Sequence, residues 1–393
     1  MIIAHLALGY AVVVIFAQAL SVSLAMRKCR KRDAPLAPPP DAPPVSVVQP
    51  LCGIEPFSEE TLKAVFALDY PAYELLFCLA RADDPVKPLV RRAMASHPTR
   101  PARLLIGDER PSANPKLNNI VKGWKAARHD WIVVVDSNVL TPRDYLQRLA
   151  ASWRADAGIV CAPPIGSAPA SMAAELECAF LNTYQARWQY AGEACGFGFA
   201  QGKSMLWRRD ILERAGGIER LGDEIAEDAA ATKLVHRAGL KAYLVEGPFE
   251  QPLGRRSWSD VWSRQLRWAR LRRATFPLIF IPEIFSSGLF AILAACLAAP
   301  ALGWPATVCG SAAALVWYGS EAVLAYVAGW RFGRWMPLAF ALRDAALPLL
   351  WLQAWTSNRV EWRGHAMSVA DGSLSGQAPH PQDALIARLP SSH

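Results

Sequence analysis

The sequence is poor in charged residues, which make up only 19% of its 393 residues, while 52% are hydrophobic. It contains no visible internal repeat and no motif for nucleic-acid binding, so repeat proteins and nucleic-acid-binding proteins are disfavoured. Its eight cysteines form no Cys-x-x-Cys pair and no cysteine–histidine spacing typical of zinc sites. Scattered cysteines suit a reducing compartment. The net charge is +8. Because the basic residues cluster beside apolar segments and no nucleic-acid motif is present, this charge points to anionic lipids or small anionic substrates as partners.

Acidic and basic residues are absent from residues 1–26, a stretch long enough to cross a bilayer core. Five cations follow at once: Arg27, Lys28, Arg30, Lys31 and Arg32. Cations directly after an apolar helix tend to stay in the cytoplasm. A cleaved signal peptide would have its charges before the apolar core instead. We therefore predict a transmembrane anchor at 1–26, with the next domain in the cytoplasm.

Residues 27–44 form a basic, proline-rich linker, which predicts a stiff, extended spacer. Beyond it, short β-rich runs alternate with helical patterns, which is typical of an α/β domain with a mainly parallel sheet. Strands are predicted at Val45–Gln49, Tyr73–Leu79, Arg103–Ile106, Trp131–Asp136 and Gly158–Val160, and helices at Glu59–Ala67 and Lys116–Ala127. Ligands of such sheets bind beyond the carboxyl ends of the strands.

The last third of the chain is apolar again, with no charged residue from Ile284 to Ser320. This stretch is too long for one straight helix. Pro300, Gly303 and Pro305 in its middle predict a turn between two helices. We therefore predict C-terminal membrane helices within residues 276–357.

A further apolar stretch from Met336 to Trp355 is interrupted by Arg343 and Asp344. A charge pair at the middle of a bilayer is costly. We therefore predict that this stretch is interfacial or re-entrant, and that the tail at 358–393 is cytoplasmic, like the domain at 45–275.

Two acidic clusters follow predicted strands. Asp83 and Asp84 follow the strand at Tyr73–Leu79, where carboxylates can bind ribose hydroxyls or a uracil NH. An ordinary surface turn is the alternative. Asp136 ends an apolar strand, with Asn138 two residues later, and one carboxylate with a diphosphate can hold a magnesium-type ion. A helix cap or turn is the alternative there.

Two further clusters lie on predicted helices. Glu227 and Asp228 open a helix, where acids either stabilise the helix dipole or supply a general base that reaches into the cleft. Arg264, Arg267 and Trp268 share one face of a helix at 257–274. The guanidinium groups can bind a leaving diphosphate. The alternative is an amphipathic helix on anionic lipid, and one helix can serve both roles.

The order of these clusters resembles family-2-like glycosyltransferases, and several short motifs resemble the ceramide glucosyltransferase family. The resemblance covers about residues 45–275. Its motifs are Gln49-Pro50-Leu51-Cys52-Gly53, Leu68-Asp69-Tyr70-Pro71-Ala72-Tyr73-Glu74, Asn114-Pro115-Lys116-Leu117-Asn118-Asn119, Gly202-Lys203-Ser204 and Ala215-Gly216-Gly217.

The resemblance implies a GT-A (Rossmann-like) fold, a UDP-sugar donor, a divalent cation (Mg²⁺ or Mn²⁺) and inversion at the anomeric carbon. It implies nucleotide-sugar binding by a set of polar residues: Asp83, Asp84, Lys116, Asp136 and Glu227. It further implies that Asp136 holds the metal, that Asp228 is the catalytic base, and that Arg264, Arg267 and Trp268 form the (Q/R)xxRW signature. Animal members have a histidine in the stretch corresponding to Phe180–Ala191. Gln185 is the nearest candidate here.

We therefore expect a multi-pass enzyme of a bacterial inner membrane. It should move a hexose from a UDP-sugar to the primary hydroxyl of a membrane lipid, and ceramide is the acceptor that we expect. Its partners are the donor, the acceptor lipid and the bilayer, with no nucleic acid. A hopanoid or diacylglycerol acceptor is an alternative. A processive polysaccharide synthase is another, but three or so spans make a poor channel. A non-catalytic nucleotide-binding scaffold is disfavoured, because the acidic clusters are all present.

Overall fold

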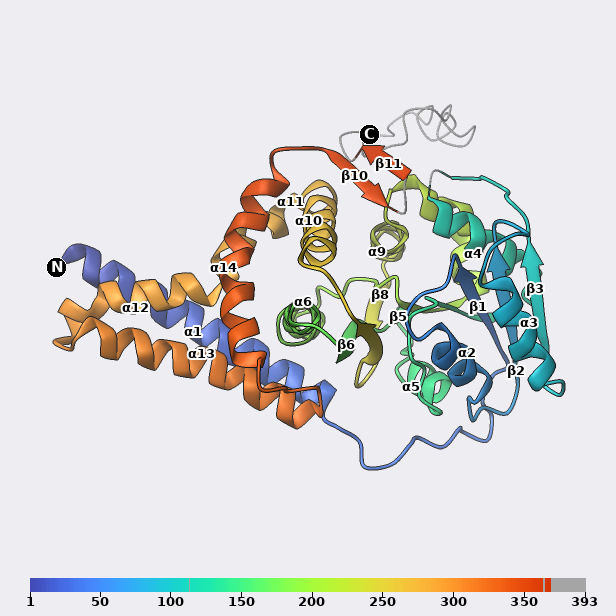
Figure 1. Ribbon diagram of the computed structural model, residues 1–393, viewed down its shortest axis with the longest axis horizontal. Helices are drawn as coiled ribbons and strands as arrows, with labels where there is room; N and C mark the ends of the chain where they lie inside the picture. The colour runs from blue at the N-terminus through green and yellow to red at the C-terminus, as the bar shows by residue number, and fades with distance from the viewer. Residues whose placement is uncertain (113, 363–364, 369–393) are drawn as a thin grey trace, which may run out of the picture.

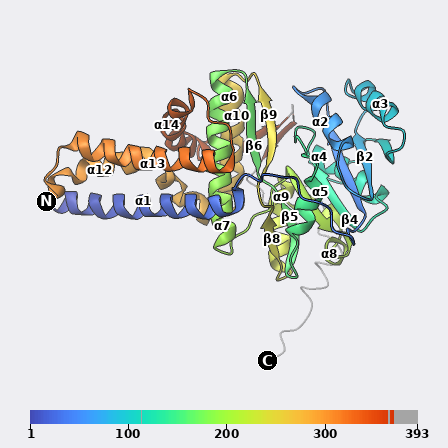
Figure 2. The same ribbon diagram turned by 90° about the horizontal axis from the view of Figure 1, so that it is seen from below.

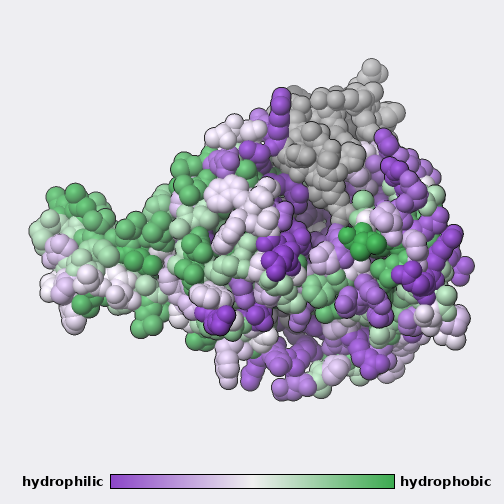
Figure 3. All heavy atoms as spheres, viewed as in Figure 1, coloured by the Kyte–Doolittle hydropathy of each residue, from purple (hydrophilic) through white to green (hydrophobic). Residues whose placement is uncertain are grey.

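The computed structural model describes residues 1–112, 114–362 and 365–368 and consists of two parts (Figure 1). One part is an α/β domain, and the other is a bundle of long helices that projects from it, with the N-terminus at the far end (Figure 2). On the face seen in Figure 3, hydrophobic residues gather on the bundle and hydrophilic residues on the domain. On this face, the surface of the bundle therefore suits an apolar environment, whereas the surface of the domain suits water.

Seven strands form the main sheet, in the order β3-β2-β1-β4-β7-β5-β8. They are β1 (Val45–Leu51), β2 (Tyr73–Leu79), β3 (Ala102–Ile106), β4 (Trp131–Val135), β5 (Ala157–Cys161), β7 (Ser204–Arg208) and β8 (Lys241–Leu244). Neighbouring strands are parallel, except that β7 is antiparallel to both β4 and β5. The predicted α/β class and mainly parallel sheet are confirmed, and β7 and β8 are additions that the sequence analysis did not predict.

Helices cover both faces of this sheet. They are α2 (Ser58–Phe66), α3 (Lys87–Ser96), α4 (Pro115–Ala126), α5 (Tyr145–Ala151), α8 (Arg209–Arg214) and α9 (Glu227–Arg237). Val47 of β1 belongs to one buried cluster with α2, α3 and α5, and Val48 belongs to another with α4 and α9. Successive strand residues point to opposite faces, so a strand covered on both sides is a continuous apolar run. A Cβ at Gly123 of α4 would come within 2.4 Å of Val48, so this helix lies very close to the sheet.

A smaller layer joins the domain to the bundle. Its strands β6 (Pro164–Pro169) and β9 (Phe249–Gly254) pair in parallel. After β6, the chain continues through α6 (Met172–Ala179), a π-helix (Phe180–Ala186) and α7 (Arg187–Ala194), and after β9 it enters α10 (Trp258–Thr275). Ser257 and Asp260 form a capping box that begins α10 and satisfies two backbone N–H groups. The predicted helix at 257–274 is confirmed.

The bundle consists of α1, α12 and α13, which lie side by side in both views (Figures 1 and 2). Their bounds are Ile2–Cys29, Gly288–Leu302 and Ala306–Ala328. By length and composition, α1 and α13 could each cross a membrane. A third span is available if α12 is joined to the short helices at 277–286 that precede it at a 52° bend. The predicted turn is confirmed, because Gly303 ends α12 with a φ of 68° and Pro305 caps α13.

Helix α14 (Met336–Ala354) lies across the bundle rather than along it (Figure 1). Arg343 and Asp344 in its middle are fully buried within the protein. The Arg343 guanidinium donates to both carboxylate oxygens of Glu321 on α13, at 2.7 and 3.0 Å, and to Asp344 at 2.8 Å. Pairing of this kind offsets the cost of removing charges from water. Among the described residues, α14 does not meet the criteria for a candidate span.

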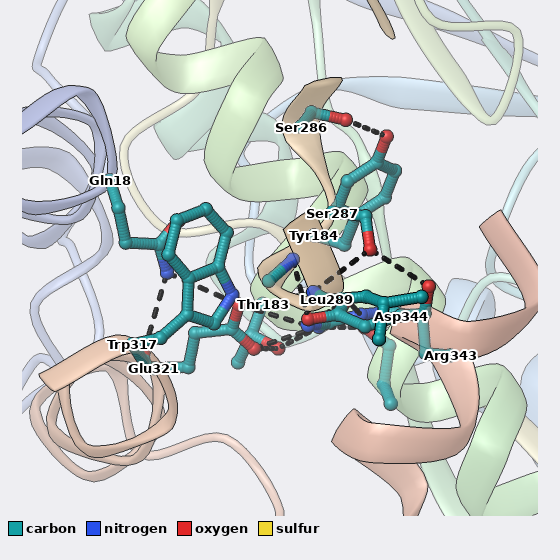
Figure 4. Close-up of polar contacts among 12 residues, drawn as sticks. Gln18, Thr183, Tyr184, Ser286, Ser287, Leu289, Trp317, Glu321, Arg343 and Asp344 are labelled. Carbon is teal, nitrogen blue, oxygen red and sulfur yellow. Dashed lines mark hydrogen bonds and ion pairs between the residues drawn. The ribbon is translucent and has the colours of Figure 1, made fainter. Parts of the chain in front are cut away.

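The same buried network reaches the first helix of the chain and the smaller layer (Figure 4). Gln18 on α1 donates to Glu321 at 3.2 Å, and Thr183 on the π-helix donates to it at 2.8 Å. Arg187, at the start of α7, donates to Gln18 and to Ser21 of α1. Polar contacts therefore tie α1, α13 and α14 to the layer that leads into the α/β domain.

Two connecting segments complete the fold. The predicted linker at 27–44 begins within α1 and continues as an irregular segment, in which the Leu36 N–H donates to the Asp144 carboxylate at 2.9 Å. After α14, a hairpin forms from β10 (Arg359–Trp362) and β11 (His365–Ser368). Of the tail predicted at 358–393, residues 363–364 and 369–393 lie outside the described residues.

Candidate active site

Polar residues gather where the parallel strands β2, β1 and β4 end. The carboxyl ends of parallel strands share one edge of a sheet, where ligands of α/β proteins bind. Because β7 is antiparallel to β4, its amino end lies at the same edge, and the Asp136 N–H donates to the Lys203 carbonyl at 3.0 Å. Residues after β4 and before β7 are thereby brought together, although they are far apart in sequence.

Asp84 and Asp83 have different surroundings despite being neighbours. The Asp84 carboxylate accepts hydrogen bonds from the Gly53 N–H, at 3.1 Å to both oxygens, and from the Val86 N–H at 2.9 Å. It therefore lies against the end of β1. Asp83 is 67% exposed and pairs with Arg81 at 2.6 Å. The structure thus places Asp84 at the candidate site and turns Asp83 towards solvent.

Asp136 lies between two lysine ammonium groups. Its Oδ1 is 2.7 Å from Lys116 Nζ and its Oδ2 is 2.9 Å from Lys203 Nζ. Burial by itself would raise the pKa of Asp136, but the two lysine charges outweigh burial and lower this pKa to about 2. Burial lowers the pKa of Lys203, whereas the charges of Asp136 and Glu227 overcome burial and raise the pKa of Lys116. The centre of the site is therefore a compact cluster of paired charges.

Glu227, the first residue of α9, extends this cluster. Its carboxylate binds Lys116 Nζ at 2.5 Å and accepts from the Asn114 side chain at 2.9 Å. Asn114 also caps α4, since its side-chain oxygen accepts from the N–H groups of Lys116 and Leu117. Glu227 is thus more than an acid placed at a helix dipole, because it holds Lys116 in contact with Asp136.

Asp228 adjoins the charge cluster but forms no ion pair with any residue that the structure describes. Its carboxylate accepts from the Gly202 N–H at 3.2 Å and from the Ala229 N–H at 2.9 Å. Burial, followed by the negative charge of Glu227, raises the pKa of Asp228 to about 6. A carboxylate with such a pKa can accept a proton near neutral pH, as a general base must.

Gly202 allows these groups to meet. A Cβ at this position would lie 2.9 Å from the Glu227 carboxylate, 3.3 Å from that of Asp228 and 3.3 Å from Lys116 Nζ. The Gly202 carbonyl also accepts from Lys116 at 2.7 Å. A side chain at this position would crowd the carboxylate and ammonium groups of the cluster, so the absence of a Cβ lets them approach one another closely.

Helix α10 contributes the predicted arginine and tryptophan residues at the side towards the bundle. Arg264 pairs with the buried Glu177 of α6 at 2.7 Å, and its guanidinium lies 6.0 Å from the centre of the Trp268 ring. Its charge also helps to lower the pKa of Lys203, so it lies near the cluster. Arg267 is half-buried on the same helix. Gln185 of the π-helix donates to Gln265 of α10 at 2.8 Å.

The site offers oxygen ligands that suit a divalent cation, but a lysine ammonium already contacts them. Ions of the magnesium type are held by one or two carboxylates together with phosphate oxygens and water. Asp136 offers one carboxylate and Asn138 one amide oxygen, and Lys203 Nζ contacts both, at 2.9 and 3.0 Å. Within the described residues, no three His, Cys, Asp or Glu side chains gather as metal ligands. The residues fit such an ion provided that the Lys203 ammonium leaves them.

Sequence reasoning missed three residues of the site. Lys203 and Asn114 belong to short motifs that were recognised, but neither was assigned a role. Glu177 was missed entirely, because an acid within the apolar pattern of α6 has no distinctive neighbour in sequence. The signal for Lys203 was its position directly after a glycine and before a strand. Its contact with Asp136 depends on the pairing of β7 with β4.

The fold and this site define the class of the protein: an α/β domain of the GT-A glycosyltransferase type with apolar helices at both ends. A mannosyltransferase from Pyrobaculum calidifontis, solved with GDP-Man and Mn²⁺, has a similar structure at a TM-score of 0.50 and 21% identity, over 87% of this chain and 99% of that one. The chain belongs to glycosyl transferase family 21, whose profile matches residues 6–375.

The chain is also similar to proteins named ceramide glucosyltransferases. Ceramide glucosyltransferase 1 of Caenorhabditis elegans is 28% identical over 248 residues, which are 63% of this chain and 53% of that protein. The ceramide glucosyltransferase of Komagataella phaffii is 35% identical over 118 residues, 29% of this chain and 23% of that protein. The chain spans about half the length of the Caenorhabditis relatives that it matches.

Proposed function

We propose that the protein is a membrane glycosyltransferase that moves a hexose from a UDP-sugar to the primary hydroxyl of a lipid, ceramide in the first instance. The observation that carries this proposal is the half-buried Asp228 carboxylate, whose pKa is raised to about 6 beside a cluster of lysines suited to a diphosphate. Family membership and relatives named ceramide glucosyltransferases support the lipid acceptor. A hopanoid or diacylglycerol is the alternative acceptor.

The proposed reaction is a single displacement. The Asp228 carboxylate takes the proton of the lipid hydroxyl, whose oxygen bonds to the anomeric carbon as the bond from that carbon to the UDP oxygen breaks. Negative charge then grows on the departing diphosphate, where nearby cations stabilise it. We assign this role to Lys116 of α4 and Arg264 of α10, together with Arg267 and Trp268 of α10. Attack from the face opposite the leaving group inverts the anomeric carbon.

We assign nucleotide binding to residues at the carboxyl ends of the strands. Asp84, against the end of β1, would bind the nucleoside, with Asp83 at the rim of the site. Asp136 would hold a divalent cation together with diphosphate oxygens. Such an ion would supply further positive charge to the leaving diphosphate when bound. Glu227 would act by fixing Lys116, which it contacts at 2.5 Å.

A site beside the membrane would let the acceptor lipid reach the enzyme without leaving the bilayer. Helix α10 places Arg264 near the charge cluster and ends at Thr275, directly before the apolar segment at 277–286. Leu278 in that segment is 85% exposed, which suits contact with lipid. A lipid headgroup could therefore enter the site while its chains stay in the bilayer. The catalytic domain would face the cytoplasm of a bacterium, with the spans in the inner membrane.

The test is product formation by the purified protein in lipid nanodiscs. Ceramide, diacylglycerol and a hopanoid are each supplied with UDP-glucose, and the lipids are analysed by mass spectrometry while released UDP is measured. A β-linked hexosyl lipid from one acceptor, absent with Asp228→Asn, is the expected result. Release of UDP without a glycosylated lipid, or a growing polysaccharide, would overturn the proposal.

A further inference from the structure

Lys203 belongs to the lysine cluster but is assigned no separate step in the displacement described above, although it is held at the centre of the site. The β4–β7 pairing fixes its backbone beside that of Asp136, with a hydrogen bond of 3.0 Å between them. Its side chain is only 18% exposed. Its ammonium contacts Asp136 Oδ2 at 2.9 Å and Asn138 Oδ1 at 3.0 Å. These are the two side chains that were assigned above to a divalent cation.

The two lysines of the cluster are bound differently. Lys116 is shared by two carboxylates, those of Asp136 and Glu227, and by the Gly202 carbonyl. Lys203 faces one carboxylate and one neutral amide, so its charge is matched by fewer negative partners. An incoming diphosphate would offer the Lys203 ammonium a second anionic partner. The flexible four-carbon side chain of lysine allows its ammonium to follow a phosphate oxygen by rotation alone.

This inference rests on the donor site proposed above. We infer that Lys203 binds the diphosphate of the donor and supplies positive charge that a divalent cation would otherwise supply. The ammonium and the ion share Asp136 and Asn138, so they compete for the same oxygens before the nucleotide arrives. The diphosphate then draws Lys203 away from Asp136 and opens this carboxylate to the ion. Nucleotide binding is therefore only partly dependent on metal.

The inference is tested by binding rather than turnover. Full-length protein in detergent is titrated with UDP by calorimetry, once in excess EDTA and once with Mn²⁺. The wild type is expected to bind UDP in EDTA. Lys203→Met should weaken binding there by about tenfold or more, the scale of one hydrogen bond to a charged group. The loss should be smaller with Mn²⁺, and Lys203→Arg should retain most of the affinity.

A second measurement follows the metal itself. Without nucleotide, the paramagnetic resonance signal of Mn²⁺ should report tighter binding to Lys203→Met than to the wild type, because Asp136 has lost its competitor. Lys241→Met is the matched control, since Lys241 forms an exposed pair with Asp156 at 2.9 Å. It should change neither UDP nor Mn²⁺ binding. Thermal melting of each variant confirms that folded protein is compared.

The outcomes separate this inference from the function on which it rests. A wild type that binds UDP only with Mn²⁺, or a Lys203→Met variant that binds UDP in EDTA as well as the wild type, overturns the role of Lys203 and leaves the donor intact. Unchanged Mn²⁺ affinity in Lys203→Met overturns the competition. A wild type that binds no UDP under either condition overturns the proposed donor, and this inference with it.

Discussion

At the scale of single residues, Asp228 is the group on which the proposed chemistry depends. Asp228→Asn keeps the shape of the side chain and removes the proton acceptor, so turnover should fall by about 10²–10⁴-fold, the usual contribution of a positioned base. UDP affinity should be nearly unchanged, because binding is assigned to other residues. Initial rates and UDP titrations measure the two effects.

A matched control for this variant is Asp210→Asn on α8, which removes a carboxylate that pairs with exposed arginines. It should keep normal turnover. A dead Glu227→Gln together with an active Asp228→Asn would move the base to Glu227. Normal turnover by both variants would remove the base from this helix altogether.

The pH dependence of turnover follows from the raised pKa of Asp228. A base must be deprotonated to act, so kcat/KM should fall as pH decreases through about 6, the pKa of this carboxyl. The charge of Glu227 is one cause of that pKa, so Glu227→Gln should move the acidic limb to lower pH. A profile of kcat/KM between pH 4.5 and 8 checks this. An acidic limb that stays in place in Glu227→Gln would contradict the prediction.

The sequence allowed the chemically distinctive residues to be predicted, but not their partners. Asp84, Asp136 and Asp228 were recognised because each follows a strand or opens a helix. The contacts of Asp136 with Lys116 and Lys203 were not predictable, because they join three segments separated by at least 20 residues in sequence. Such contacts depend on the order of strands in the sheet, which no local pattern records.

At the scale of elements, the pairing of Arg343 with Glu321 between α14 and α13 is expected to be essential for a stable fold. Arg343→Met would leave two buried carboxylates without their partner, which costs about 3–5 kcal/mol for a buried pair. The variant should melt at a clearly lower temperature in detergent and give less folded protein. Arg334→Met, on the exposed segment before α14, should have little effect.

A double variant makes this prediction specific. Adding Glu321→Gln to Arg343→Met removes one of the two stranded charges and should recover part of the lost stability. A double variant that is less stable than Arg343→Met alone would mean that Glu321 has a further role. If Arg343→Met itself melts like the wild type, the network does not stabilise the protein.

The elements that were predicted best are those with strong local patterns. The largely apolar strands β1, β2 and β4 and the turn at Gly303 follow directly from the sequence. Strand β7 and the π-helix at Phe180–Ala186 were missed. The five residues of β7 have no clear alternation and become a strand because β4 and β5 pair with them. The π-helix continues α6 and α7 without a signal that separates it from an α-helix.

At the scale of the whole molecule, the positions of cations predict the orientation in the membrane. The domain after residue 44 and the segment after α14 should both lie in the cytoplasm, with the turn between α12 and α13 outside. Cysteines are introduced separately at Trp304, in that turn, and at Thr356, after α14. An impermeant maleimide applied to intact cells should modify position 304 only. Cys52, which is exposed on the domain, serves as a native reporter for the cytoplasmic side in a background where the other exposed cysteine, Cys195, is replaced by serine.

Labelling at position 356 from outside, with Cys52 protected, would contradict this arrangement and would mean that α14 crosses the membrane. Labelling at Cys52 in intact cells would instead reverse the whole orientation. Permeabilised cells, in which all three positions should react, provide the control for accessibility.

The buried network between Gln18, Arg187 and Glu321 has a consequence for how the chain is made. A ribosome delivers α1 first, but the partners of Gln18 on α7 and α13 emerge about 170 and 300 residues later. Until α13 is made, Gln18 lacks its Glu321 partner. The buried network is therefore completed only after the whole α/β domain between these helices has been synthesised. A chain that ends before α13 would leave the Gln18 amide without this carboxylate.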